Sequence, residues 1–306
     1  MAPITSSSFA LDLKPGVNKW YGLKYAEYPI EFLGIFTKHN SSLAFEEEVS
    51  ATGFGLAGVK TEGGTISYDS AQQGFINRYT HITYGLGFMI TKEMAEDGIA
   101  VTQSFRRAQA LAFSMRQTKE TIAANVYNRA FNTSYTMGAQ SDALPLCSAA
   151  HLNKTGGTWS NLLSPAADLS EAAMEQACIN IAALKNDRGL LIAVRPQKLI
   201  IPPALEYEAI RLLKSEFQPG TANNDVNAIR VLGKFPQGIV VNHYLTDANN
   251  WFIGTDCPDG IKYFERRADN FDIDNDFDTE NAKFKATFRC SFGWTDARAL
   301  YGSQPA

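Results

Sequence analysis

Hydrophobic side chains recur along residues 101–131 with the spacing of one helix face. The steps alternate between four and three residues, and only Lys119 interrupts a series of apolar or small side chains: Val101, Phe105, Ala108, Ala112, Met115, Ile122 and Val126. Polar residues occupy the opposite side: Gln103, Arg106, Arg107, Gln109, Gln117, Glu120 and Asn128. The pattern predicts one amphipathic helix of about 30 residues, about 45 Å long. A helix of an ordinary bundle or coiled coil is the alternative, but no second stripe of this length occurs.

Before this helix, residues 1–40 carry many aromatic side chains with little periodicity: Trp20, Tyr21, Tyr25, Tyr28, Phe32 and Phe36. Two interpretations remain open. The segment is either an arm that lies across another surface, or an N-terminal helix and strand that belong to the core.

Residues 41–91 combine alternating strand patterns with several glycines. Alternation at Thr65–Asp69 and at Arg78–Tyr84 predicts strands, and the glycines mark turns or bulges. We therefore expect a long two-stranded excursion. Because an isolated two-stranded hairpin is only marginally stable in water, this excursion needs another surface.

After the long helix, a loop region over residues 132–168 precedes a predicted α/β unit at 186–256. Ser170 is the expected N-cap of a helix that extends to about Asn186, and Pro202-Pro203 opens a helix that extends to about Lys214. Short apolar runs predict strands at 191–194, 199–201, 229–232, 239–241 and 251–253. The tail is β-like at 261–264 and 284–292.

Composition restricts the class of protein. With 306 residues and 45% hydrophobic content, the chain can form one large domain or two ordinary ones. A net charge of −4 gives no basic signature for sequence-specific nucleic-acid binding or for an anionic membrane surface. We see no apolar run long enough for a transmembrane span and no secretory signal. The four cysteines lie at least 31 residues apart, which favours small buried side chains over metal ligands or disulfides.

Motifs that carry chemistry are weak. Residues 53–58 read GFGLAG, but neither the apolar strand nor the helix of a dinucleotide site flanks them. Aspartates at every second position over 272–278 lack the glycine of an EF-hand, so a solvated acidic turn is expected there. His151 lies near Cys147 and Ser148, yet no third group that could orient it is visible. We therefore expect no catalytic, cofactor-binding or metal-binding residues and no enzymatic activity.

Three stretches together resemble the major capsid proteins of tailed bacteriophages, which have the Hong Kong 97 fold. They are residues 81–97 (HITYGLGFMITKEMAED), the loop 145–161 with PLCSAAH and GGTWSN, and the ending 292–302 (FGWTDARALYG). The resemblance covers roughly residues 30–302. A tail-tube or sheath protein of the same kind of virus is an alternative, as is an enzyme of unknown class supported only by GFGLAG.

The resemblance implies an α+β fold with five parts. These are an N-terminal arm and lead-in (1–49), an extended β-hairpin loop across a neighbouring subunit (50–88), a peripheral domain with the spine helix 101–131 (89–185), an axial domain (186–256) and returning strands of the peripheral domain (257–306). It also implies self-assembly into pentamers and hexamers that form an icosahedral shell in the virion, built in the host bacterial cytoplasm. Expected partners are a separate scaffolding protein, a portal protein, a possible decoration protein and packaged double-stranded DNA without sequence specificity, but no membrane.

Some members of this family cross-link their shells through a lysine of the extended loop, and Lys60 is the lysine in this loop; an ordinary solvated side chain is the alternative. The expected contacts between subunits involve ten residues: Trp20, Tyr21, Phe54, Lys60, Tyr68, Phe75, Arg78, Arg106, Arg107 and Arg116.

Overall fold

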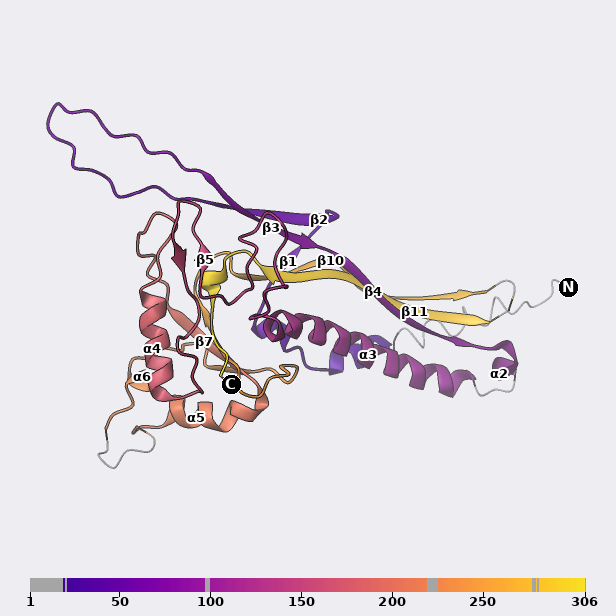
Figure 1. The fold of residues 1–306 in the computed structure, drawn as a ribbon. Helices are drawn as coiled ribbons and strands as arrows, with labels where there is room; N and C mark the ends of the chain where they lie inside the picture. Colours follow the sequence, from indigo (N-terminus) through magenta and orange to yellow (C-terminus); the bar gives the residue numbers. More distant parts are fainter. Residues whose placement is uncertain are drawn as a thin grey trace.

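The computed structural model describes residues 19, 21–96, 100–218, 225–276, 279 and 281–305. The expectations for Trp20 and for residues 1–18 of the arm lie outside these residues. Two four-stranded sheets and a long helix dominate the described chain (Figure 1). This arrangement confirms the α+β class expected from the sequence.

The first sheet has the order β1-β10-β11-β4. Its strands come from both halves of the chain: β1 (Thr37–Asn40), β4 (Ile82–Ile90), β10 (Ile261–Asn275) and β11 (Ala282–Trp294). β1 is parallel to β10, whereas β10–β11 and β11–β4 are antiparallel. The long helix α3 (Ala100–Asn128) lies along this sheet, and the short helix α2 (Lys92–Glu96) precedes it (Figure 1).

The second sheet has the order β12-β9-β7-β8. It comprises β7 (Pro196–Ile201), β8 (Ile239–Val241), β9 (Trp251–Thr255) and β12 (Leu300–Ser303). Three helices pack with it around a separate hydrophobic cluster: α4 (Glu171–Ala182), α5 (Glu206–Lys214) and α6 (Ala228–Val231). Two-stranded pairs join β2 (Phe45–Ala51) to β3 (Gln73–Thr80) and β5 (His151–Leu152) to β6 (Thr158–Trp159). Short 3-10 turns are η1 (Phe32–Gly34), η2 (Pro203–Leu205) and η3 (Ala297–Ala299).

Helix α3 confirms the predicted long helix, and it ends three residues earlier than expected. Ala108, Ala112 and Met115 of the stripe are buried against the first sheet. The prediction that Glu120 lies on a polar face is wrong, because this side chain is fully buried. Its carboxylate accepts hydrogen bonds from the backbone N–H groups of Glu31 (3.1 Å) and Phe32 (3.0 Å) at the start of η1. Helix α3 is therefore covered on two sides, by the sheet and by the N-terminal segment.

The N-terminal segment belongs to the core, at least over residues 21–40. Residues 21–27 are helical, and Phe32, Ile35 and Phe36 are buried in the same cluster as α3. Aromatic rings interlock there: Phe36 contacts Tyr127 and Phe292 edge-on, with ring centroids 5.7 and 5.1 Å apart. Of the two interpretations of this segment, the core helix and strand hold for the described part.

Several expected elements are confirmed. Ser170 caps α4, and its hydroxyl accepts a hydrogen bond from the Ala173 N–H at 3.3 Å. The expected strands at 199–201, 239–241 and 251–253 appear as β7, β8 and β9, and the helix after Pro202 appears as η2 and α5. The β-like tail is present as the much longer strands β10 and β11.

Three expected strands are wrong. Residues 191–194 form no strand, because Ala193 has a left-handed φ of 52° that interrupts extended backbone. Residues 228–231 form the single turn α6, since the Asn227 side chain caps it by accepting from the Arg230 N–H at 3.2 Å. The alternating segment 65–69 lies in an irregular loop over residues 52–72, which no other described strand pairs with.

The acidic run also differs from its expected turn. Asp272 and Asp274 lie inside β10, opposite Lys285 and Lys283 of β11. Cross-strand pairs of opposite charge stabilise a sheet. Asp272 and Asp274 therefore support strand pairing between β10 and β11, where a turn was expected. Within the described residues, no group of three or more histidine, cysteine or acidic side chains has a metal-binding arrangement.

The structure also bears on the expectations for the cysteines and for membrane-spanning helices. All four cysteines are free, and Cys147, Cys178 and Cys290 are buried while Cys257 is partly exposed. Among the described helices, none combines the length and the hydropathy that crossing a bilayer requires.

Candidate assembly interface

An exposed apolar loop projects from the paired strands β2 and β3. Figure 1 shows the loop over residues 52–72 extending away from both sheets. Large hydrophobic side chains on it are almost fully exposed, for example Val59 (98%) and Tyr68 (96%), with Phe54, Leu56 and Ile66 also exposed. Contiguous exposed apolar surface on a soluble chain marks a site of interaction with another surface.

The two legs of this loop are held together near its base. Thr52 and Gln72 exchange hydrogen bonds, from the Thr52 N–H to the Gln72 carbonyl (3.0 Å) and from the Gln72 N–H to the Thr52 hydroxyl (2.8 Å). The Asp69 carboxylate accepts from the Gly55 N–H at 2.8 Å and pairs with Arg188 of the second-sheet unit. The hydrogen bond from Arg188, supported by the Gly55 N–H, lowers the pKa of Asp69 to about 2. The clamp is therefore charged at neutral pH.

An ion network around the buried Lys262 side chain fixes strand β2 to the first sheet. The Lys262 ammonium lies 2.7 Å from the Glu48 carboxylate and 2.8 Å from Asp259. Burial alone would lower the pKa of Lys262, but the hydrogen bonds to Asp259 and Glu48 outweigh it and raise the pKa. Thr295 joins the network through Glu48, so the base of the loop is rigidly attached while the loop itself is exposed.

Strand β3 is anchored on its other side. The Ile76 N–H donates to the Gln140 carbonyl at 3.0 Å, and the Arg78 N–H donates to the Met137 carbonyl at 2.9 Å. The Arg78 guanidinium stacks on the Phe45 ring at 3.8 Å, which leaves the charged edge partly exposed. These contacts set the direction in which the loop leaves the subunit.

The structure places nine of the ten expected interface residues, and these form three groups. Five belong to the loop or to β3, with exposed or partly exposed side chains: Phe54, Lys60, Tyr68, Phe75 and Arg78. Arg106 and Arg107 are exposed on α3, and the Arg107 guanidinium donates to the Met89 carbonyl of β4 at 3.3 Å. Trp20 lies outside the described residues.

Tyr21 and Arg116 are buried within the subunit and so differ from the other expected interface residues. The Tyr21 hydroxyl donates to Asp269, and Arg116 stacks on the Tyr25 ring at 4.1 Å while donating to the Tyr25 carbonyl. Burial and the hydrogen bond to Asp269 raise the pKa of Tyr21, so its hydroxyl stays protonated. Both side chains act inside one subunit: Tyr21 holds the N-terminal segment on β10, and Arg116 holds it on α3.

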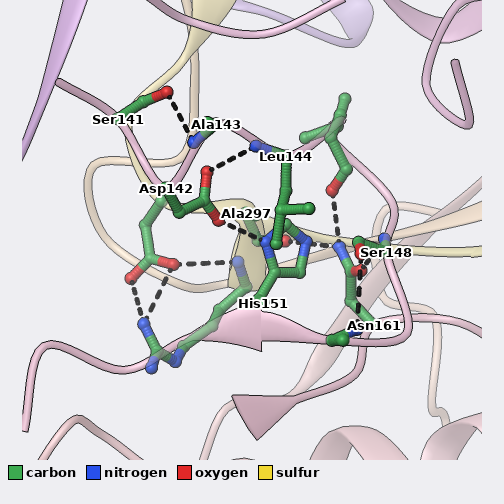
Figure 2. Close-up of polar contacts among 12 residues, drawn as sticks. Ser141, Asp142, Ala143, Leu144, Ser148, His151, Asn161 and Ala297 are labelled. Carbon is green, nitrogen blue, oxygen red and sulfur yellow. Dashed lines mark hydrogen bonds and ion pairs between the residues drawn. The ribbon is translucent and has the colours of Figure 1, made fainter. Parts of the chain in front are cut away.

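No motif in the sequence indicates which group orients His151. Figure 2 shows that His151 Nδ1 faces the Asp142 carboxylate, 2.6 Å away, and the imidazole also stacks on the Trp159 ring. The imidazole is fully buried, and burial raises the pKa of the neighbouring Cys147 thiol. The pair links Asp142 of the loop after α3 to His151 at the start of β5.

Asn161 is a second structural residue that sequence reasoning missed. Its side-chain N–H₂ group donates to the carbonyls of Leu146, Ala297 and Leu300, and its oxygen accepts from the Ser148 N–H (Figure 2). This buried amide joins three segments at the junction of the two sheets.

Comparisons with known proteins identify relatives of this chain among phage capsid proteins. A family model described as phage capsid protein matches residues 76–303. A search of curated proteins finds no match.

Solved capsid structures share the fold at low sequence identity. The capsid of a native GTA particle has 15% identity and a TM-score of 0.55, and the match covers 89% of this chain and 88% of that chain. Mycobacterium phage Adephagia has 12% identity and a TM-score of 0.53, with 91% of each chain covered. The procapsid of bacteriophage JBD30 has 13% identity and a TM-score of 0.52, with 98% of this chain and 76% of that chain covered. The family match extends over most of the sequence, and the fold agrees with it: this chain belongs to the phage capsid protein family.

Proposed function

We propose that this chain is the major head protein of a tailed double-stranded DNA bacteriophage and that its copies assemble into a closed icosahedral shell around the genome. The exposed apolar loop on a rigid base carries this proposal. Large apolar side chains in water are unfavourable, and a neighbouring copy that covers the loop would remove them from water. Closed rings of five and six copies need heterologous contacts, in which different surfaces of each subunit meet.

The two hydrophobic clusters support a division of the subunit into two domains. We assign residues 50–88 to the extended loop, 89–170 and 257–299 to a peripheral domain built on α3, and 171–256 with 300–303 to an axial domain that lies near the symmetry axes. Helix α4 and strand β12 pack in the cluster of the second sheet, so we include them in the axial unit.

Seven exposed or partly exposed residues remain our proposed contacts between copies: Phe54, Lys60, Tyr68, Phe75, Arg78, Arg106 and Arg107. Their contacts are individually modest, and a shell would gain its stability by summing many of them. The loop supplies apolar side chains and α3 supplies cations.

We also propose the partners that such a shell requires. They are a separate scaffolding protein, a portal protein, a possible decoration protein and packaged DNA, which the inner surface would contact weakly and without sequence preference. The shell would form in the host bacterial cytoplasm and remain in the virion, with no cofactor and no catalytic step. Binding of DNA fragments that weakens with salt fits this proposal, and a preference for one base sequence contradicts it.

Negative-stain electron microscopy of the purified full chain tests the proposal. The chain is expressed alone and together with candidate scaffolding genes. We expect closed isometric particles, or pentameric and hexameric rings, in at least one condition. A monodisperse small species under every condition would refute the shell function, and open tubes that persist with every scaffold would favour a tail-tube or sheath role.

A further inference from the structure

One segment with a strand pattern pairs with none of the strands in the described part of the subunit. Residues 65–69 (Thr-Ile-Ser-Tyr-Asp) alternate as a β-strand does, yet they lie in the irregular loop, with Ile66 and Tyr68 exposed to 62% and 96%. Strand propensity expresses itself only where a partner satisfies the backbone N–H and C=O groups. The segment therefore has the composition of a strand and lacks the pairing.

Strand β4, in turn, has a free edge that lacks a partner strand among the described residues. It is the terminal strand of the first sheet, and within the described ranges no backbone hydrogen bond from another strand reaches its outer edge. Its nine residues, ITYGLGFMI, include no charge and no proline, and Ile82, Leu86 and Met89 are each about half exposed. Natural edge strands usually carry charges, prolines or bulges that prevent pairing with other chains. An edge of this length without such protection is suited to pairing.

Two glycines leave the backbone of β4 bare on one face. Gly85 and Gly87 alternate with larger residues, so they share the face opposite the core. A Cβ at Gly87 would lie 2.5 Å from the Phe284 carbonyl oxygen, and one at Gly85 would lie 2.9 Å from the Thr287 methyl group. Close packing with β11 thus requires glycine at both positions, and the same bare backbone lets a further strand approach the edge.

Residues 65–69 and the free edge of β4 cannot pair with each other within one subunit. Figure 1 shows the loop projecting beyond β2 and β3, while β4 leaves that region toward α2 at the far end of α3. Charge also favours a contact between copies. Residues 61–70 carry no cation and carry Glu62 beyond the Asp69–Arg188 clamp, whereas exposed Arg106 and Arg107 lie on α3 beside β4.

We propose that residues 65–69 of one subunit add as an edge strand to β4 of the next subunit. The occupant is a second copy of this chain, and the contact is head-to-tail, as closed rings require. The Asp69–Arg188 clamp holds one end of the incoming segment in its own subunit. This inference rests on the proposed shell function and specifies how neighbouring copies would recognise each other.

Disulfide trapping in assembled particles tests the pairing. Tyr68→Cys is combined with Thr83→Cys or with Leu86→Cys, which sample the two faces of β4, and with Val231→Cys as an equally exposed control on α6. Disulfides need Cα atoms within about 7 Å. After mild oxidation we expect covalent multimers with at least one β4 position, at least tenfold above the control and above each single variant. Intact particles in which both β4 positions cross-link no more than the control would overturn the proposal.

Hydrogen exchange on the unmodified chain avoids any effect of substitution on folding. Amides of residues 65–69 and 82–90 are compared between unassembled subunits and particles. We expect both segments to exchange at least tenfold more slowly in particles. Particles in which residues 65–69 exchange as fast as in free subunits would overturn the strand pairing while leaving the shell function intact. Failure to form particles under every condition would instead overturn the shell function, and this proposal with it.

Discussion

The buried side-chain amide of Asn161 contributes to the free energy of unfolding of the subunit, and its hydrogen bonds allow that contribution to be calculated. Its nitrogen donates to the carbonyls of Leu146 (2.7 Å), Ala297 (3.0 Å) and Leu300 (3.0 Å), and its oxygen accepts from the Ser148 N–H (2.8 Å). The side chain is fully buried, so water cannot replace these partners without rearrangement of the site. We predict that Asn161→Ala strongly destabilises the unassembled subunit.

The size of the effect follows from the bonds that are lost. Two N–H hydrogens serve three carbonyls, so the amide makes about three full hydrogen bonds when the one it accepts is included. Each net hydrogen bond contributes about 0.5–1.5 kcal/mol, and each buried group left without a partner adds up to about 1–3 kcal/mol. We expect a loss of about 3–5 kcal/mol, a large fraction of the 5–15 kcal/mol typical of a folded domain.

Urea unfolding of free subunits, followed by tryptophan fluorescence, measures this loss. Gln176→Ala on the exposed face of α4 is the control, and we expect it to change the free energy of unfolding by less than about 0.5 kcal/mol. Asn161→Asp keeps the acceptor, loses the donors and buries a charge, so it should be at least as damaging as Asn161→Ala. A loss below about 1 kcal/mol for Asn161→Ala, at an unchanged urea dependence, would refute the reasoning.

Three further predictions concern the buried charges and the loop. Lys262→Met leaves the partly buried Glu48 carboxylate without its partner, and we expect urea unfolding to show a loss of about 2 kcal/mol, partly restored by a second substitution, Glu48→Gln. Asp69→Asn releases the loop clamp, and we expect trypsin to cleave after Lys60 about two- to fivefold faster in free subunits. Burial, together with a nearby arginine, lowers the pKa of His81 in the native state, so the unfolded state binds more protons and the free energy of unfolding falls as the pH drops through and below about 6.5.

Each of these predictions has a matched control. Lys285→Met, on an exposed side chain of β11, should cost less than about 0.5 kcal/mol. Ser67→Ala should leave tryptic cleavage at Lys60 unchanged, and equal acceleration by both loop variants would contradict the clamp. His81→Gln removes the titrating ring, so it should flatten the fall in stability between pH 7.5 and 5.5. An identical slope in this variant would show that another group is responsible.

The sequence predicts most of the regular structure because periodicity reports burial on one face. The stripe on α3, the cap at Ser170 and the apolar runs of β7 and β9 all depend on local spacing, and all appear in the structure. The burial of Glu120 could not be predicted in this way, because it depends on the N–H groups at the start of η1, almost ninety residues away in the sequence. No pattern within one helix can indicate such a partner.

Strand pairing explains the remaining errors. The run at 228–231 has strand composition, but the cap at Asn227 favours a helical turn. The alternation at 65–69 is a valid strand signal without a partner inside the subunit. For the interface, Phe54, Tyr68 and Arg106 are exposed and their roles stay predictions, whereas Arg116 is buried because the N-terminal segment covers it. The charge pattern of a helix cannot reveal which segment will later cover it.

The order of strands in the first sheet has a consequence for when the subunit can exist at all. β1 pairs with β10, so Thr37 lies beside Lys262, and β10 and β11 separate β1 from β4. Until residues 261–294 have been synthesised, β1 and β4 have no neighbouring strands in this sheet, and closing the sheet joins residues more than 200 positions apart. Such non-local pairing makes folding slow and exposes strand edges while synthesis proceeds. A chain that stops before residue 261 lacks β10 and β11, so it cannot form the first sheet. Synthesis of these two strands is therefore the step that commits the subunit to its fold.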